Sequence, residues 1–410
     1  MSPTTVVIGA SVGGVRTAQA LRAAGYAGEV VLVGAEAELP YDKPPLSKGV
    51  LVGAQRLDDI CLLTREAAER DRIRLRLGRA AARLDPARSR VVLDDGAEIP
   101  YDDVVIATGA GARPSPWGTP KGLHVLRSAA DAVALRADLL RGGPVVVIGG
   151  GFIGAEVACA ARALGRQITV VDPAPVPMSR VLGDEIGESV IALHHRNGVA
   201  TRFGIGVETV TESASGLTVN LTNGEVLAAR TVVVGIGADP NVAWLTSAGL
   251  LIDDGVVCDE HGRAVGAPRV YAVGDVARWW DPGRAARIRV EHWTNAVEQA
   301  AVVAHNIVHP DDPRSHAPIE YVWSDQHDWK IQIVGHTAAA RERAVIGDTS
   351  AGPFAALYSD DGRRFSGAVV VNWPKALIAC RRALAARTEY ATVRANIEAL
   401  RTTRSVGVRV

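Results

Sequence analysis

The stretch TTVVIGASVGG, residues 4–14, joins a β-branched run to a glycine turn, and an apolar helix start follows at Val15. In such a turn the first glycine permits a tight bend, a small second residue lets backbone approach a diphosphate, and the last glycine lets the helix pack on the strand. The diphosphate then lies at a helix N-terminus, where free N–H groups and the helix dipole favour an anion. The stretch therefore predicts a dinucleotide site formed by Gly9, Ser11, Gly13 and Gly14.

A second stretch, VVVIGGGFIG at residues 145–154, has the same strand–turn–helix pattern. Two such stretches predict two dinucleotides, and the obvious use for two is redox chemistry with resident FAD and a visiting nicotinamide. Asp172 ends the next predicted strand, residues 168–171. An acid there accepts a hydrogen bond from the adenosine 2′-hydroxyl and repels a 2′-phosphate, so it favours NAD over NADP. The residues of this loop that we assign to NADH are Gly149, Gly151, Phe152, Ile153 and Gly154.

The pattern around the two glycine stretches predicts an internal duplication. Each stretch lies in a βαβ unit, over residues 4–33 and 144–171. Hairpin-like segments follow at residues 90–101 and 217–227, and each leads into a short apolar strand. The duplication predicts an α/β fold with two Rossmann-like dinucleotide-binding domains.

The order of the later segments predicts how the domains follow along the chain. An apolar strand at residues 270–273 needs a sheet to join, which indicates that the second domain is inserted into the first. After Pro318 shorter strands at residues 330–334, 355–359 and 365–371 and a helical tail from Lys375 predict a third, α+β domain. The predicted domains are an FAD-binding domain of residues 1–112 and 242–318, an NAD-binding domain of residues 113–241 and a C-terminal domain of residues 319–410.

Composition limits the classes of function. The 410 residues are 48% hydrophobic and carry a formal net charge of +0, which argues against a nucleic-acid-binding protein. The predicted strand at Thr4 leaves no room for a signal peptide, and no apolar run approaches the ~20 residues of a membrane helix. We therefore expect a cytoplasmic protein without a membrane partner.

The cysteines predict no metal cluster and no disulfide framework. Cys61, Cys159, Cys258 and Cys380 are far apart, and none forms a C-x-x-C pair. We expect small, buried, apolar side chains in a reducing compartment.

Further motifs follow the first glycine stretch in a characteristic order and spacing. These are PPLSK at 44–48, ATG at 107–109, the second glycine stretch through Glu156, GIG at 235–237, VGD at 273–275, EHWTNA at 291–296 and VWSDQ at 322–326. Together they resemble the NADH-dependent ferredoxin reductases of bacterial oxygenase systems, of the putidaredoxin reductase, rhodocoxin reductase and biphenyl dioxygenase reductase type. The resemblance covers nearly the whole chain and implies a glutathione-reductase-like fold.

The resemblance assigns roles to residues of the FAD site. Gly9, Ser11 and Gly14 hold the diphosphate, Lys48 lies near the reactive edge of the flavin, and Asp275 suits a ribityl hydroxyl. The further FAD contacts that it implies are Ala81 at adenine, Arg127, and Trp293 and Trp323 beside the flavin. Family members often have Asp where this chain has Ala35 and Arg where it has Leu39. We expect Glu36 to take the place of the missing ribose-binding acid.

The resemblance also assigns roles on the NADH side. Phe152 covers the nicotinamide pocket, Glu156 meets the carboxamide or Lys48, and Gly237 belongs to the same site. Lys48 and Glu156 are the two residues that we expect to act in catalysis. The implied reaction passes a hydride from NADH to FAD and then single electrons to a [2Fe–2S] ferredoxin, which serves a cytochrome P450 or a Rieske oxygenase.

Three other classes compete with this interpretation. A disulfide reductase or thiol peroxidase needs a reactive cysteine near the flavin, but the corresponding loop has Pro44, Pro45 and Ser47. A membrane quinone reductase should end in an amphipathic helix, whereas residues 391–410 are polar with spaced arginines. An NADH-sensing flavoprotein like apoptosis-inducing factor shares the fold, and slow flavin reduction without ferredoxin turnover would identify it.

The C-terminal segment is strongly basic. Between Asp361 and Val410 the acids are Asp361, Glu389 and Glu398. The basic residues of this segment are Arg363, Arg364, Lys375, Arg381, Arg382, Arg387, Arg394, Arg401, Arg404 and Arg409. Since the ferredoxins of such systems are typically acidic, the resemblance implies transient electrostatic docking on this segment.

Overall fold

The computed structural model describes residues 2–214, 216–338, 340–350 and 352–406. The chain divides into two compact units. The first contains residues 1–43, 56–111 and 238–318, and the second contains residues 44–55, 112–237 and 319–410. Among the described residues, none of the helices combines the length and the apolar character needed to cross a bilayer.

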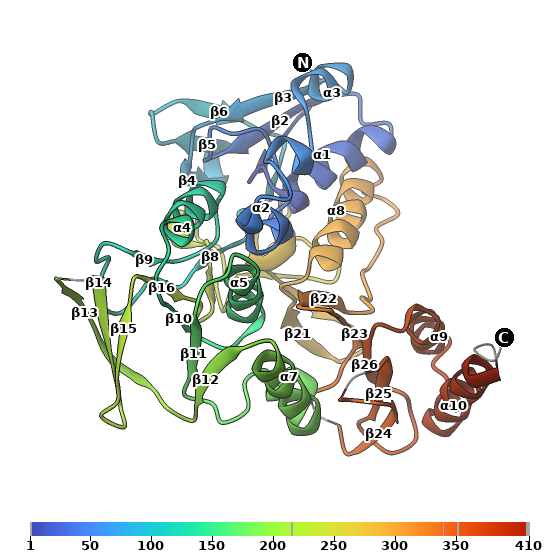
Figure 1. Ribbon diagram of the computed structural model, residues 1–410. Helices are drawn as coiled ribbons and strands as arrows, with labels where there is room; N and C mark the ends of the chain where they lie inside the picture. Colours follow the sequence, from blue (N-terminus) through green and yellow to red (C-terminus); the bar gives the residue numbers. More distant parts are fainter. Residues whose placement is uncertain (1, 215, 339, 351, 407–410) are drawn as a thin grey trace. The chain divides into compact units, whose positions relative to one another are not determined.

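A parallel sheet forms the core of the first unit (Figure 1). Its strands, in spatial order, are β19 (Val270–Ala272), β7 (Asp103–Ile106), β1 (Thr4–Ile8), β2 (Glu29–Gly34) and β3 (Ile73–Leu77). Strands β1, β2, β7 and β19 are buried along most of their length, as a parallel sheet covered on both faces requires, whereas the edge strand β3 is fully buried only at Ile73. Helix α1 (Val12–Ala23) begins within the first glycine stretch and packs against α8 (Trp293–Val308).

Strand β19 confirms the predicted return of the chain to its first sheet. Val270 pairs with Val104, and Ala272 pairs with Ile106, both in parallel register. The predicted hairpin at residues 90–101 is also present, as β5 (Arg90–Leu93) and β6 (Glu98–Pro100). The other elements of this unit are α3 (Arg65–Arg70), β4 (Ala81–Asp85), β17 (Ala238–Pro240), β18 (Val256–Cys258), β20 (Ala277–Asp281) and β21 (Ala286–Arg289).

The second unit repeats the parallel arrangement. Its strands, in spatial order, are β12 (Val199–Phe203), β11 (Ile168–Asp172), β10 (Val145–Ile148), β16 (Thr231–Val234) and β9 (Leu123–His124). An antiparallel sheet of β13 (Val207–Ser213), β14 (Gly216–Leu221) and β15 (Val226–Ala229) contains the predicted hairpin at residues 217–227. The helices of this part are α4 (Ala129–Arg141), α5 (Phe152–Ala163), α6 (Ser179–Leu182) and α7 (Asp184–Arg196), and the loop at residues 44–55 holds the short α2 (Gly49–Val52).

The C-terminal part is α+β, as predicted, with an antiparallel five-stranded sheet. The strands, in spatial order, are β22 (Tyr321–Gln326), β23 (Trp329–Gly335), β26 (Gly367–Val371), β25 (Phe354–Ser359) and β24 (Glu342–Gly347). Strands β23, β25 and β26 correspond to the strands predicted after Pro318, whereas β22 and β24 were not predicted. The helical tail consists of α9 (Pro374–Ala385) and α10 (Tyr390–Val406), and both helices pack against this sheet (Figure 1).

The two glycine turns have the same backbone geometry. Gly9 N–H donates to the Val33 carbonyl at 2.8 Å, and Gly149 N–H donates to the Val171 carbonyl at 2.8 Å. Both glycines have positive φ angles, +113° and +105°. Because a side chain at either position would overlap a neighbouring carbonyl, the turn requires glycine there.

The glycine that closes each turn allows the helix to approach the strand. A Cβ at Gly14 would lie 1.8 Å from the Gly9 carbonyl oxygen, and one at Gly154 would lie 1.9 Å from the Gly149 oxygen. A Cβ at Gly151, by contrast, would have no heavy atom within 4 Å, and the Gly151 backbone is extended, with φ −71°. The second glycine loop therefore contains a tolerant glycine, Gly151, close to the obligatory Gly154.

We expect Gly154→Ala to lower the apparent melting temperature of the FAD-saturated protein by about 5 °C or more, because overpacking against backbone costs about 1–3 kcal/mol. The matched control Gly151→Ala should shift it by less than about 2 °C, as for a substitution in open space. Thermal unfolding followed by circular dichroism measures both. Equal shifts for the two variants would contradict this account of the turn.

Candidate functional site

The first glycine loop fits a diphosphate. Helix α1 begins at Val12 with no acidic residue in its first turn, and within the described chain the Ser11 hydroxyl makes no capping hydrogen bond. The first N–H groups of an α-helix have no partner within the helix. They are therefore available to an anion, and the small side chain of Ser11 leaves the approach open. These features fit the FAD diphosphate expected at Gly9, Ser11, Gly13 and Gly14.

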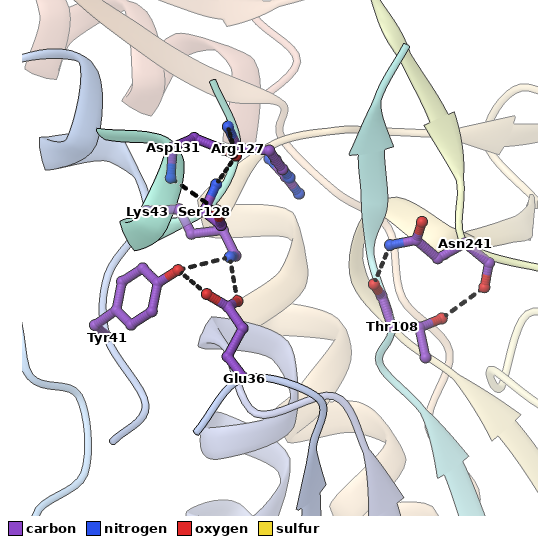
Figure 2. Close-up of polar contacts among 8 residues, drawn as sticks. All are labelled: Glu36, Tyr41, Lys43, Thr108, Arg127, Ser128, Asp131 and Asn241. Carbon is purple, nitrogen blue, oxygen red and sulfur yellow. Dashed lines mark hydrogen bonds and ion pairs between the residues drawn. The ribbon is translucent and has the colours of Figure 1, made fainter. Parts of the chain in front are cut away.

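Glu36, the predicted ribose-binding acid, lies in a small polar cluster (Figure 2). Its carboxylate accepts a hydrogen bond from the Tyr41 hydroxyl and forms an ion pair with the Lys43 Nζ at 3.0 Å. Lys43 also lies 3.3 Å from the Tyr41 hydroxyl. Since each carboxylate oxygen has two acceptor sites, these contacts leave capacity for a ribose hydroxyl.

The turn that follows β7 is hydrogen-bonded to Asn241. Thr108 Oγ1 donates to the Asn241 carbonyl at 3.0 Å, and Asn241 Nδ2 donates to the Thr108 carbonyl at 2.8 Å (Figure 2). This reciprocal pair holds the ATG turn next to the carboxyl end of the sheet, where ligands bind in α/β folds.

The remaining expected FAD residues of the first unit have defined local positions. Trp293 begins α8, and its indole N–H donates to Asp42 Oδ1 at 2.8 Å. Asp275 is half-buried in the turn after β19, and its carbonyl accepts from the Arg289 guanidinium at 3.1 Å. Ala81 begins β4 and is half-buried.

Two further expected FAD residues belong to the second unit. Arg127 precedes α4 and donates its backbone N–H to Asp131 Oδ2 at 3.0 Å, in the capping box that Ser128 and Asp131 form (Figure 2). Trp323 lies in β22 with its ring stacked on Tyr321, the centroids 5.9 Å apart. The bonds of the capping box fix the backbone from which the Arg127 side chain extends.

The second glycine loop holds Asp172 at the place expected for cofactor selection. Gly150 N–H donates to Asp172 Oδ2 at 2.7 Å, and Ala174 N–H donates to Oδ1 at 2.8 Å. The carboxylate is thus fixed at the end of β11, beside the glycines. The open space beside Gly151 leaves room for a diphosphate at the start of α5.

The residues around this loop differ in exposure. Phe152 is partly buried and packs against an apolar cluster that includes Leu182 and Trp329. Ile153 is 45% exposed. Gly237 has φ +113°, as its place at the end of the GIG turn requires. The Phe152 side chain is therefore part of an apolar core in the structure. To cover nicotinamide it would have to leave that cluster.

The centre of the candidate site is the carboxylate of Glu156. This residue lies on α5, with only 3% of its surface exposed. Its Oε2 accepts from Lys48 Nζ at 2.7 Å and from Ser47 Oγ at 2.5 Å, and its Oε1 accepts from Ser324 Oγ at 2.7 Å. Of the two partners implied for Glu156, the nicotinamide carboxamide or Lys48, the structure shows the contact with Lys48. Four side chains from three sequence-distant segments thus form one node, which we call the Glu156 node.

Ser47 and Ser324 had no role predicted from the sequence. They belong to the PPLSK and VWSDQ motifs, and both are buried. A buried carboxylate needs donors for its lone pairs, and short hydroxyl side chains supply them. The motifs therefore drew attention to both serines, but only the fold shows that the two serines bind the same carboxylate.

An open cavity of about 440 Å³ adjoins the Glu156 node within the second unit. Lys48, Glu156, Cys159 and His327 contribute to its lining. Burial raises the pKa of the Cys159 thiol to about 12, although a backbone hydrogen bond from His327 opposes the shift. The thiol is therefore protonated at neutral pH and is no activated nucleophile.

Two histidines lie beside Cys159. Burial lowers the pKa of His194 to about 4, and burial also lowers the pKa of His327. Both imidazoles are therefore neutral at pH 7. The four cysteines of the chain are free thiols. The site thus lacks the disulfide and the thiolate that disulfide reductase chemistry needs.

Comparison with protein families identifies two matching regions. Residues 3–300 match the pyridine nucleotide-disulphide oxidoreductase family, and residues 321–401 match the reductase C-terminal family. The first match includes both glycine loops, and the second begins at β22.

Curated relatives and a solved structure cover almost the whole chain. The ferredoxin–NAD(+) reductase component of an anthranilate 1,2-dioxygenase system from Burkholderia cepacia is 39% identical over 93% of this chain and 94% of its own length. Rhodocoxin reductase from Rhodococcus erythropolis is 36% identical over 93% and 89%. The covalent putidaredoxin reductase–putidaredoxin complex matches with a TM-score of 0.89 and 32% identity, over 94% of this chain and 93% of that chain. The chain belongs to the pyridine nucleotide-disulphide oxidoreductase family, as a member of its ferredoxin–NAD(+) reductase branch.

Proposed function

We propose that this chain is an FAD-dependent ferredoxin–NAD(+) reductase, which takes hydride from NADH and passes single electrons to a [2Fe–2S] ferredoxin of a cytochrome P450 or Rieske oxygenase. The observation that carries the proposal is the match to such reductases over both glycine loops and the C-terminal domain. The PPLSK loop supports it further, because prolines and serine occupy the place where a disulfide reductase needs cysteine. We place the reaction in the cytoplasm, where NADH is available.

We assign residues 1–112 and 242–318 to FAD, residues 113–241 to NADH and residues 319–410 to the C-terminal domain. FAD supplies the conversion between two-electron and one-electron transfer. The protein's part is to orient the two cofactors and to set the local charge. In this scheme Lys48 presents a cation that stabilises negative charge as the bound cofactor gains electrons. Glu156 holds that cation in place and lowers the cost of its burial.

We propose that Asp172 selects NADH over NADPH. Asp172→Ala should reduce the NADH-to-NADPH ratio of kcat/KM at least about tenfold, or ~1.4 kcal/mol, because it removes a ribose contact and a repulsion. Asp172→Asn removes the charge but keeps an acceptor oxygen for one backbone N–H group. A similar loss of the ratio in Asp172→Asn would therefore assign the preference for NADH to the charge of Asp172. Steady-state kinetics with both nucleotides measures the ratio.

Glu188→Ala, at an exposed acid on α7, is the matched control and should leave the ratio unchanged. Our assignment of Asp172 is wrong if the wild-type enzyme uses the two nucleotides equally well, or if neither Asp172 variant changes the ratio.

We propose that the ferredoxin docks on α9. Arg381 and Arg382 are both exposed on this helix. The Arg381 guanidinium lies over the Tyr321 ring at 5.1 Å, and Tyr321 stacks on Trp323, the expected flavin neighbour. The exposed charge of α9 is thus connected by direct ring contacts to the residue expected beside FAD. Of the basic segment, the Arg404 side chain and Arg409 lie outside the described residues.

Reversing both charges, Arg381→Glu with Arg382→Glu, should lower kcat/KM for an acidic [2Fe–2S] ferredoxin about tenfold or more at low salt, because steering between opposite charges raises the association rate. Raising the salt should produce the same loss in wild type as the Debye length falls to ~3–8 Å. NADH-driven reduction of a small neutral quinone should change little in both cases.

Arg65→Glu with Arg88→Glu makes the same change in net charge at exposed sites of the first unit and serves as the control. Ferredoxin would dock elsewhere if its turnover were unchanged in the Arg381→Glu, Arg382→Glu variant. The same conclusion would follow if the control variant lost as much turnover.

A further inference from the structure

A cluster of metal-ligating side chains lies within the second unit, outside the Glu156 node. Cys159 of α5, His194 of α7 and His327 of the turn between β22 and β23 each offer one ligand atom, and these atoms lie within 4.8 Å of one another. His194 is 5% exposed, and Cys159 and His327 are half-buried. Sequence analysis predicted no metal site, since these residues are 35 or more positions apart.

The spacing of the two imidazoles matches a tetrahedral site. His327 Nε2 lies 3.3 Å from His194 Nδ1. Two nitrogens at ~2.0–2.1 Å from a tetrahedral zinc ion are about 3.3–3.4 Å apart. The two nitrogens are therefore already at the separation that one shared ion requires, and the Cys159 sulfur lies within 4.8 Å of both.

The neighbouring groups orient His194 as they do in many metal sites. Its Nε2 lies 3.2 Å from Gln326 Oε1, an acceptor, so that nitrogen carries the proton and Nδ1 presents its lone pair to the cluster. Gln326 Nε2 donates in turn to Ser324 Oγ at 3.2 Å, and Ser324 donates to Glu156. A ligating histidine whose second N–H is held by an oxygen is the usual arrangement at protein metal sites.

We propose that Cys159, His194 and His327 bind one Zn²⁺ ion per chain. Binding would release the Cys159 proton to solvent, because a coordinated cysteine is a thiolate. One thiolate and two imidazoles suit zinc, and three protein ligands leave the fourth position of a tetrahedral ion for water. Cys159 and His327 line the open cavity beside Lys48 and Glu156, which gives the ion a route in. Arg162 and Arg196 are the cations near His327, and Asp328 is the nearby acid that partly offsets them.

The test uses the FAD-loaded protein and Co²⁺ as a spectroscopic probe for Zn²⁺. Titration should give a thiolate-to-cobalt charge-transfer band and visible bands of a tetrahedral ion beyond the flavin absorption, saturating at one ion per chain and displaced by Zn²⁺. Cys159→Ser should abolish the charge-transfer band. His327→Asn, chosen because asparagine tolerates the positive φ of this position, should weaken Zn²⁺ binding at least tenfold by calorimetry.

Two controls separate this site from adventitious binding. Cys61→Ser removes another half-buried thiol, and His195→Gln removes the exposed histidine next to His194 on α7, whose ring contacts Thr201. Neither should change the spectrum or the affinity. FAD content and melting temperature check that each variant is folded. Absence of saturable binding, or a charge-transfer band that persists in Cys159→Ser, would overturn the proposal.

Discussion

A buried carboxylate organises the candidate site of the second unit. Glu156 is almost wholly buried, and an unpaired charge there would cost several kcal/mol. The buried charge is stabilised by three hydrogen-bond donors, Ser47 and Lys48 of the PPLSK loop and Ser324 of β22. The same bonds hold the ammonium of Lys48 in one position. Compensation of one buried charge thus fixes the loop, the helix and the first strand of the C-terminal sheet together.

Backbone geometry explains why the fold was predictable. Each glycine turn has an obligatory glycine with positive φ, and the strands beside it are β-branched runs, so the local sequence predicts the βαβ units. Strands β22 and β24 were missed because they alternate weakly and depend on partners in their sheet. The Glu156 node was predicted only as one possible pair, and the Cys159–His194–His327 cluster was not predicted at all. Both depend on contacts between segments more than a hundred residues apart, such as Ser324 with Glu156 and His327 with His194.

In the proposed scheme the C-terminal domain connects the reaction to its ferredoxin partner. Strand β22 contributes Ser324 to the Glu156 node. It also carries Tyr321, whose ring lies beneath Arg381 of α9, and Trp323, which stacks on Tyr321. Because side chains alternate along a strand, one short segment serves both the charged node and the proposed docking helix. If ferredoxin docks there, this arrangement is a physical reason for the C-terminal domain, since we assign the two cofactors to the other domains.

The central claim is that the Glu156–Lys48 pair serves the transfer of hydride from NADH as well as the fold. Anaerobic stopped-flow mixing with saturating NADH measures the rate of flavin bleaching directly. We predict that Glu156→Gln and Lys48→Met each slow this rate at least tenfold, about 1.4 kcal/mol, while FAD content is retained and exposed Glu188→Gln has no effect. Bleaching at the wild-type rate in both variants would contradict the account and leave the pair a purely structural one.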